Sequence, residues 1–185
     1  DPDGAGCLVL TSRREMGVDG ESVVSLDRLP LDASAALFYY GWGEYSSSGQ
    51  LDAVRPDVKA ICGRGLLDGH PLAIVLAAAV ARKERLRALS SLIERLRTRM
   101  VEVLRDRKTD KEEVSLEASL GVSYDALSDT AKEMLARLAV FEEPFRDEAV
   151  EAVAGDVGAW REACTELMDH HLLDKGEAAT TKGET

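Results

Sequence analysis

Residues Thr11-Ser12-Arg13 form the first group whose types and spacing could act on a ligand. They directly follow the apolar run 7–10, which is typical of a strand buried on both faces. In open α/β sheets, ligands bind at the carboxyl ends of the strands. An arginine in that place can donate a planar pair of hydrogen bonds to a terminal phosphate. Taken alone, however, these residues are better explained as surface residues after a strand.

The second group is Gly69-His70-Pro71-Leu72. A proline ring has no N–H and a fixed φ, so Pro71 could offer a rigid apolar face to a flat base. We interpret His70 as a partly exposed loop residue, with a polar contact to a ligand as the alternative. The plainer interpretation of the whole group is structural, because Gly followed by Pro is how one helix ends and the next begins.

These two groups need elements to position them. The apolar runs 7–11 and 22–26 predict two parallel strands. Two such strands cannot form a stable sheet alone, since each needs neighbours and covering helices. We therefore expect the chain to begin inside an α/β domain whose other strands lie upstream or on another chain.

Helical signals dominate after residue 29. Asp32 is the expected N-cap of a first helix. Pro56 opens a second helix that Gly69 is expected to end, and Pro71 opens a third. Residues 84–105 carry a heptad seam that favours packing in a small bundle over a dimer zipper, because the seam is shorter than three heptads. Its members are Leu86, Leu89, Ile93, Leu96, Met100 and Val103.

The charged residues 105–111 form a connector and mark the expected domain boundary. Beyond it, four amphipathic patterns predict helices. These patterns cover 114–127, the residues from 128, 146–154 and the residues from 158. Turn signals at Lys175-Gly176 and Lys182-Gly183 could bound a hairpin. Helices followed by a hairpin predict a winged-helix module.

Charge is unevenly distributed along the 185 residues. The formal net charge of -11 argues against a general nucleic-acid binder. Residues 82–111 hold 11 Lys/Arg and 5 Asp/Glu, whereas residues 112–185 hold 6 and 18. A basic middle helix beside an acidic C-terminal module suggests that the two dock, and solvated helix faces are the alternative.

Three cysteines, Cys7, Cys62 and Cys164, are too far apart for a disulfide framework or a zinc site. We interpret them as small buried residues in a reducing compartment. The longest apolar run, 71–81, covers about half of the ~20 residues that a membrane span requires. These features predict a cytoplasmic protein that does not contact a membrane.

Two further groups are interpreted as structural. Met168-Asp169-His170-His171 lies in an amphipathic helix pattern, where adjacent histidines point about 100° apart and cannot readily share a metal ion. No metal site is therefore expected. The helical pattern at 146–151 carries three acids and one base, which would repel DNA phosphates.

Five short motifs occur in one order and together resemble the second half of the nucleotide switch in STAND ATPases, the NB-ARC class. They are Leu8-Val9-Leu10-Thr11-Ser12-Arg13, Ala36-Leu37-Phe38, Asp68-Gly69-His70-Pro71-Leu72-Ala73-Ile74, Ser123-Tyr124-Asp125-Ala126-Leu127 and Leu138-Ala139-Val140-Phe141. The resemblance implies a mainly α fold in three parts. Residues 1–28 would end a P-loop-type α/β nucleotide-binding domain, residues 29–108 would form its helical lid, and residues 109–185 a winged-helix domain.

The resemblance also implies nucleotide-binding residues. Thr11, Ser12 and Arg13 would respond to the γ-phosphate. Gly69, Pro71 and Leu72 would place the proline near the adenine, with His70 standing where the family usually has Leu. The implied cofactor is ADP or ATP with Mg²⁺ in the full-length protein. This chain contains no Gly-x-x-x-x-Gly-Lys-Ser/Thr, so we expect it to bind no nucleotide and to be inactive alone, although its parent would be a slow ATPase.

The function implied is that of the lid and winged-helix portion of an ATP/ADP-dependent signalling switch that oligomerises on activation. Its partners would be the missing N-terminal half of the nucleotide-binding domain and other copies of the full-length protein. The winged helix would make no direct DNA contact. The alternatives are a helical adaptor without nucleotide and a fragment of a STAND-type transcription regulator.

Overall fold

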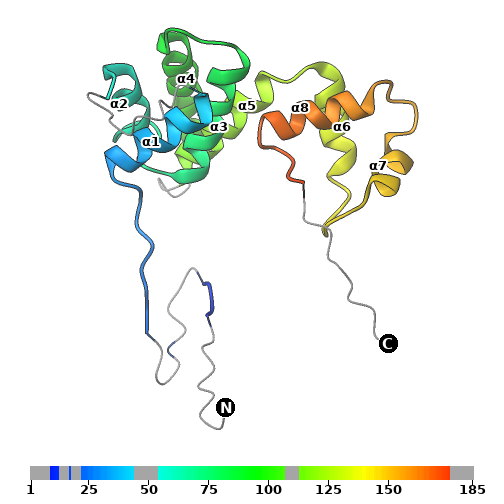
Figure 1. The fold of residues 1–185 in the computed structure, drawn as a ribbon, viewed down its shortest axis with the longest axis horizontal. Coiled ribbons are helices and arrows are strands. Elements are labelled where there is room, and N and C mark those ends of the chain that lie inside the picture. Colours follow the sequence, from blue (N-terminus) through cyan, green and yellow to red (C-terminus); the bar gives the residue numbers. More distant parts are fainter. Residues whose placement is uncertain (1–8, 13–16, 18–21, 44–53, 107–112, 176–185) are drawn as a thin grey trace.

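The computed structural model describes residues 9–12, 17, 22–43, 54–106 and 113–175. Within these ranges the chain forms eight α-helices and no strand, which confirms the prediction of a mainly α fold (Figure 1). The helices are α1 (Leu31–Trp42), α2 (Pro56–Cys62), α3 (Pro71–Lys83), α4 (Ser90–Asp106), α5 (Val114–Asp125), α6 (Asp129–Leu138), α7 (Asp147–Ala154) and α8 (Trp160–Asp169).

Helix α3 is the centre of the first five helices, which we call the helical bundle (α1–α5). It packs against α1 and α5, while α4 packs against α5 and α2. Its residues Ala73, Ile74 and Leu76–Ala81 are all buried. A helix covered on nearly every face needs no polar stripe, which explains the uninterrupted apolar run. The prediction that Pro71 opens a third helix is confirmed.

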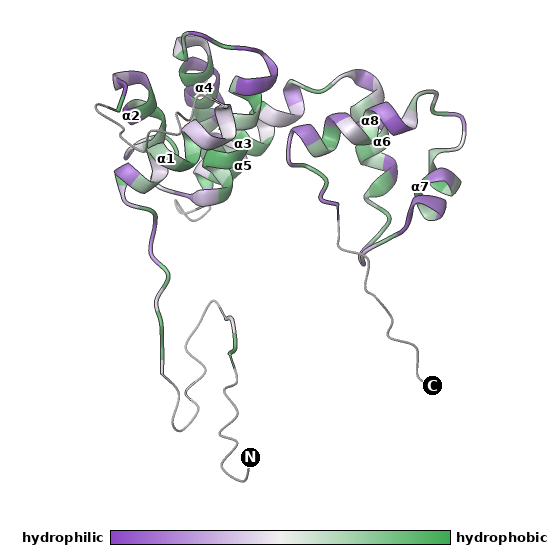
Figure 2. Cartoon of the chain, viewed as in Figure 1, coloured by the Kyte–Doolittle hydropathy of each residue, from purple (hydrophilic) through white to green (hydrophobic). Residues whose placement is uncertain are grey.

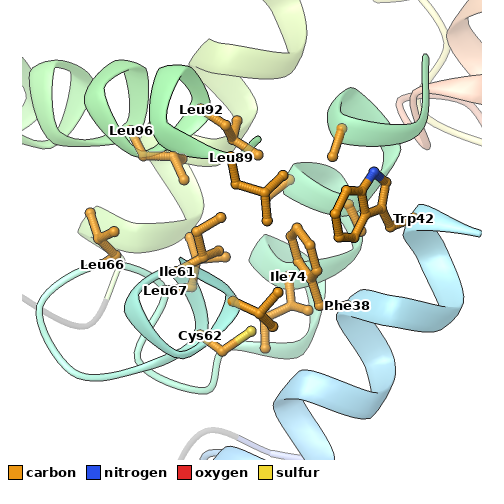
Figure 3. Close-up of a cluster of buried hydrophobic side chains, with 14 of the residues drawn as sticks. Phe38, Trp42, Ile61, Cys62, Leu66, Leu67, Ile74, Leu89, Leu92 and Leu96 are labelled. Carbon is orange, nitrogen blue, oxygen red and sulfur yellow. The ribbon is translucent and has the colours of Figure 1, made fainter. Parts of the chain in front are cut away.

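The core of the bundle is one cluster of apolar side chains, most of which come from α1, α2, α3 and α4 (Figure 3). Phe38 of α1, Ile61 of α2 and Leu92 of α4 are 0% exposed. Phe38 and Trp42 meet edge to face, with ring centroids 5.8 Å apart. Burying each such side chain contributes about 1.5–3 kcal/mol. The bundle is therefore stabilised mainly by apolar burial.

The heptad seam packs into this core. Helix α4 begins at Ser90, later than the predicted 84, so Leu86 and Leu89 precede it. Leu89 and Leu96 are fully buried, and Met100 packs partly buried against the same cluster. The seam thus serves the bundle, as the sequence predicted.

Helices α6, α7 and α8 form a second apolar cluster, and we call residues 127–175 the C-terminal module. Helix α6 packs against both α8 and α7. The buried members of the cluster are Leu127, Ala131, Met134, Leu138, Val150, Ala154, Ala163, Cys164 and Leu167. The four helical patterns predicted after residue 112 are confirmed as α5–α8. The predicted hairpin at 175–183 lies, apart from its first residue, outside the described residues.

Arg137 joins α6 to the end of α7. Its guanidinium donates hydrogen bonds to the carbonyls of Val153 (3.3 Å) and Ala154 (2.8 Å). It also pairs with Glu133 at 2.8 Å and with Asp156 at 2.9 Å. The last carbonyls of a helix have no partner within that helix, so a side-chain donor satisfies them here.

Helix α5 belongs to the bundle by its packing. Val122 lies in the first apolar cluster and Leu127 in the second, so the packing changes across Ala126. The predicted domain boundary at 108/109 falls within 107–112, outside the described residues, and stays a prediction.

The predicted N-cap of the first helix is wrong. Helix α1 begins at Leu31, and its N-cap is Pro30 rather than Asp32. The carbonyl of Pro30 accepts a hydrogen bond from the N–H of Ser34 (2.9 Å), so helical bonding starts two residues earlier than predicted. Asp32 lies in the first turn, where its charge faces the positive end of the helix.

The two predicted strands are not formed in the described residues. Val9–Thr11 and Ser22–Leu26 have no regular structure. Their apolar side chains are exposed, with Val24 at 78% and Leu26 at 92%. Figure 2 shows this apolar stretch before α1, outside the bundle. A strand must pair its N–H and C=O groups with neighbouring strands, and the described part of the chain contains none.

Candidate functional site

The Gly69-His70-Pro71-Leu72 group joins a turn to the start of α3. The prediction that Gly69 ends α2 is wrong, because α2 stops at Cys62 and residues 63–69 form turns. The N–H of Gly69 donates to the carbonyl of Cys62 (3.1 Å). The carbonyl of Gly69 accepts from the N–H of Leu29 (2.9 Å). The glycine therefore links the segment before α1 to the turn before α3.

The absence of a side chain at Gly69 is required at this link. Its φ is +67°, and a Cβ there would lie 2.3 Å from the carbonyl oxygen of Leu29. A Cβ at that distance would force the backbone of Leu29 or of Gly69 to move. The contact is with a backbone oxygen, so no flexible side chain could turn aside instead. Gly69 thus fixes where Leu29 meets the bundle.

His70 is the N-cap of α3. Its Nδ1 accepts a hydrogen bond from the N–H of Ala73 at 3.4 Å. Burial and the nearby charge of Arg28 lower the pKa of His70, so the ring is neutral and can accept this bond near neutral pH. The interpretation of His70 as a partly exposed residue is confirmed. Its capping role accounts for a polar side chain in this position without a ligand.

Pro71 and Leu72 begin α3 with their side chains exposed. Pro71 is the first residue of the helix, as predicted, and Leu72 is 46% exposed. Leu31, at the start of α1, is 40% exposed. The Leu29–Gly69 bond holds the start of α1 near the start of α3. An exposed apolar surface of this kind can contact a flat base, and it offers no group for acid–base or nucleophilic catalysis.

Thr11 and Ser12 are not brought to this surface. Both are exposed and without regular structure. In Figure 1 residues 9–12 lie well away from the bundle. Arg13, the expected γ-phosphate contact, lies outside the described residues.

The implied nucleotide fits the described residues only in part. The apolar face at Pro71 and Leu72 suits a base. The phosphate contacts would depend on Arg13 and on a phosphate-binding loop that is not among the 185 residues. The described residues therefore provide an exposed apolar face at the start of α3, and the phosphate contacts stay a prediction.

Within the residues that the structure describes, no group of three or more His, Cys, Asp or Glu side chains could hold a metal ion. Among those same residues, no helix combines the length and apolar character needed to cross a membrane. Cys62 and Cys164 are buried, as predicted, and Cys7 lies outside the described residues. Burial raises the pKa of the Cys62 thiol to about 12, which makes the thiol unreactive at neutral pH.

The sequence did not reveal a contact between the end of α3 and the end of α8. The Nζ of Lys83 lies 2.7 Å from the Oδ2 of Asp169, and Arg82 donates to the carbonyl of Asp169 (3.2 Å). His170 follows and is 1% exposed. These contacts come from the end of α3. The docking suggested by the uneven charge involved the basic middle helix, and it stays a prediction. The residues involved had no local pattern that could have identified them.

Comparisons of the chain with protein-family models, with curated proteins and with solved structures found no significant match. The functional argument therefore depends on the residues and geometry above.

Proposed function

We propose that this chain is the regulatory lid and winged-helix part of an ATP/ADP-dependent signalling switch that oligomerises on activation. The observation that carries the proposal is the junction at Gly69. There the segment that follows the predicted strands is bonded, through Leu29, to the turn that presents Pro71 and Leu72. A base bound against Pro71 would contact the lid at the point where the lid joins the nucleotide domain.

The exposed apolar segment before α1 supports the same proposal. Val23, Val24 and Leu26 have no cover from the described residues of this chain. Apolar side chains on both faces of a short run suit a strand in the middle of a parallel sheet. We propose that the missing half of the α/β domain supplies the neighbouring strands.

The C-terminal module fits the winged-helix part. Three helices follow one another in α6–α8, and the predicted hairpin would come next. Asp147, Glu148 and Glu151 of α7 are exposed, so this helix would present negative charge to a DNA backbone. We therefore propose a regulatory role without DNA contact, and place any DNA-binding function of a regulator in a separate domain.

The first test is the native protein itself. Its intact mass and the peptide sequence upstream of Asp1 should reveal a Gly-x-x-x-x-Gly-Lys-Ser/Thr loop before the predicted strand at 7–11. Binding of a fluorescent ADP analogue to that protein should then weaken about tenfold in Leu72→Glu, since a charge would replace an apolar contact worth about 1.4 kcal/mol.

Leu104→Glu is the matched control. Leu104 is an exposed leucine on α4, at 52% against 46% for Leu72, and takes no part in the Gly69 junction. Equal ADP affinity in the two variants would contradict the base contact. In addition, Arg13→Ala should weaken ATP-driven assembly more than ADP binding, and unchanged assembly would remove Arg13 from the proposed site.

A helical adaptor without nucleotide is the second candidate. The observation in its favour is that the core of the bundle is complete without a ligand: Phe38, Ile74 and Leu96 are all 0% exposed. A native protein without a phosphate loop, with ADP binding absent in the parent, would favour the adaptor.

A further inference from the structure

The C-terminal module is held to the bundle at the meeting of α3 and α8. Asp169, the last residue of α8, contacts Lys83 through its carboxylate and Arg82 through its carbonyl. The chain between the two regions is short, since α5 ends at Asp125 and α6 begins at Asp129. Release of the Asp169 contacts would leave this connection as a hinge.

His170 is enclosed beside those contacts. It is 1% exposed, and neither ring nitrogen has a hydrogen-bond partner among the described residues. A buried polar group without a partner costs free energy, and a buried charge without one costs more. The neighbouring His171 is exposed, so the enclosure is specific to one of the two rings.

Four charged groups act on the His170 ring: Glu166 and Asp169 from α8, and Lys83 and Glu84 from the end of α3. Lys83 would repel a protonated ring. The three carboxylates would attract a protonated ring. Whether they can pair with it depends on the partners that they already have.

Each carboxylate already has another partner. Glu166 accepts from the N–H of Ser128 (2.8 Å) and from its hydroxyl (2.7 Å). Glu84 pairs with Arg95 at 2.7 Å. Asp169 pairs with Lys83 across the junction. A protonated ring would therefore be buried without a carboxylate of its own.

We propose that His170 makes docking of the C-terminal module on the bundle dependent on protons: the module docks with the ring neutral, and protonation of the ring releases it about residues 126–128. The proposal concerns the contact between two parts of this chain and does not rest on nucleotide binding.

The direction of the effect follows from where the ring takes up its proton. Burial, aided by Lys83 and opposed by the carboxylates, lowers the pKa of His170 in the docked form. In the proposed released form the ring would be exposed to water, where the ordinary pKa is about 6.5. Docking is therefore strongest above about pH 6.5. Below that it weakens, by at most about tenfold per pH unit for one proton, until the docked-state pKa is passed.

The Lys83–Asp169 pair responds in a different pH window. The hydrogen bond from Lys83 lowers the pKa of Asp169. This ion pair therefore persists through the range in which His170 titrates and is lost only at more acidic pH. A transition just below neutral pH is thus specific to the histidine.

Nuclear magnetic relaxation of the ¹⁵N-labelled 185-residue chain can test the proposal without an attached fluorophore or spin label. At pH 7.5 the amides of α3 and α8 should report one rotational correlation time, because docked parts tumble together. At pH 5.5 the C-terminal module should report a shorter time than the bundle. The ring proton signals of His170 should titrate below the ordinary histidine pKa of about 6.5.

Two variants make the test specific. His170→Phe removes the titrating group and keeps an apolar ring, so its two regions should tumble together at both pH values. His171→Asn changes the exposed neighbour, whose φ of +54° Asn tolerates, and should behave as the parent. A parent that tumbles as one body at pH 5.5, a parent whose parts tumble separately at pH 7.5, or a pH response retained in His170→Phe would overturn the proposal. His170→Leu, checked by its helical circular dichroism, serves if the phenylalanine variant does not fold.

Discussion

The helical bundle and the C-terminal module bury their residues to different degrees. In the bundle, α3 is enclosed by other helices, and most of its residues are inaccessible to water. In the C-terminal module, α7 is short and contributes only Val150 and Ala154 to the buried cluster. Polar contacts of Arg137 and of Glu166 with Ser128 complete its packing. Both regions bury apolar side chains, but the C-terminal module has the smaller apolar cluster and adds polar contacts between its helix ends.

This difference predicts how stability is distributed. Local opening requires less free energy where fewer apolar contacts are lost. We therefore expect amides of α6–α8 to exchange with solvent faster than those of α3. The four predictions that follow test this contrast, from the largest expected effect to the smallest.

Phe38→Ala should cost about 3–5 kcal/mol of unfolding free energy, since it removes a fully buried aromatic ring from the bundle. Denaturant unfolding followed by circular dichroism measures the loss. Tyr40→Ala is the control on the same helix, because Tyr40 is 75% exposed, and should change the free energy by less than about 0.5 kcal/mol. Similar costs for the two variants would contradict the assignment of the core.

Gly69→Ala should cost about 1–3 kcal/mol, because it combines a positive φ with a close approach to the backbone of Leu29. Gly65→Ala shares the positive φ, but a Cβ there would meet nothing within 4 Å. Both variants can be compared by thermal unfolding and by proteolysis of the segment before α1. Only Gly69→Ala should make that segment more sensitive to protease, and the same sensitivity in both would rule out the Leu29 contact as the cause.

Ser128→Ala should cost about 1 kcal/mol and act on the C-terminal module alone. The hydroxyl of Ser128 caps α6 by accepting from the N–H of Ala131 (3.2 Å), and it donates to Glu166 of α8. Hydrogen exchange should become faster in α6 and α8 and stay unchanged in α3. Ser91→Ala, on the exposed side of α4, provides the comparison. An equal change in both regions would mean that the two regions open together.

Lys83→Met should have the smallest effect, about 0.2–1 kcal/mol, because the Lys83–Asp169 pair is exposed to solvent. The loss should shrink at high salt, which screens such pairs. A double-mutant cycle with Asp169→Asn isolates the coupling between the two residues. A coupling that does not change with salt would argue against a mainly electrostatic junction.

Local features explain which parts of the fold were predictable. The starts of α2 at Pro56, of α3 at Pro71 and of α6 after Ser128 follow from residues within one helical turn. The prediction of Asp32 as the N-cap of α1 was wrong because Pro30, two residues earlier, supplies the first accepting carbonyl. These are contacts between near neighbours, which a sequence displays directly.

Distant contacts explain what was missed. The close approach at Gly69 involves Leu29, 40 positions away in the sequence, so the glycine resembled a helix end. The charges that act on His170 include Lys83 and Glu84 at the end of α3, whereas its sequence neighbours indicated only an amphipathic helix. The predicted strands do not form in the described residues, which contain no strand that could pair with them. Of the predicted site residues, Gly69, Pro71 and Leu72 lie together, Thr11 and Ser12 lie apart, and Arg13 is not described.

The link between Leu29 and Gly69 also has a mechanical consequence. A pull on the segment before α1 reaches two places at once: the first turn of α1, through the chain, and the turn before α3, through one hydrogen bond of 2.9 Å. The close backbone contact leaves no slack between them. Tension on residues 22–28 would therefore act on α1 and α3 together. A displacement of this segment would move the two helices as one body.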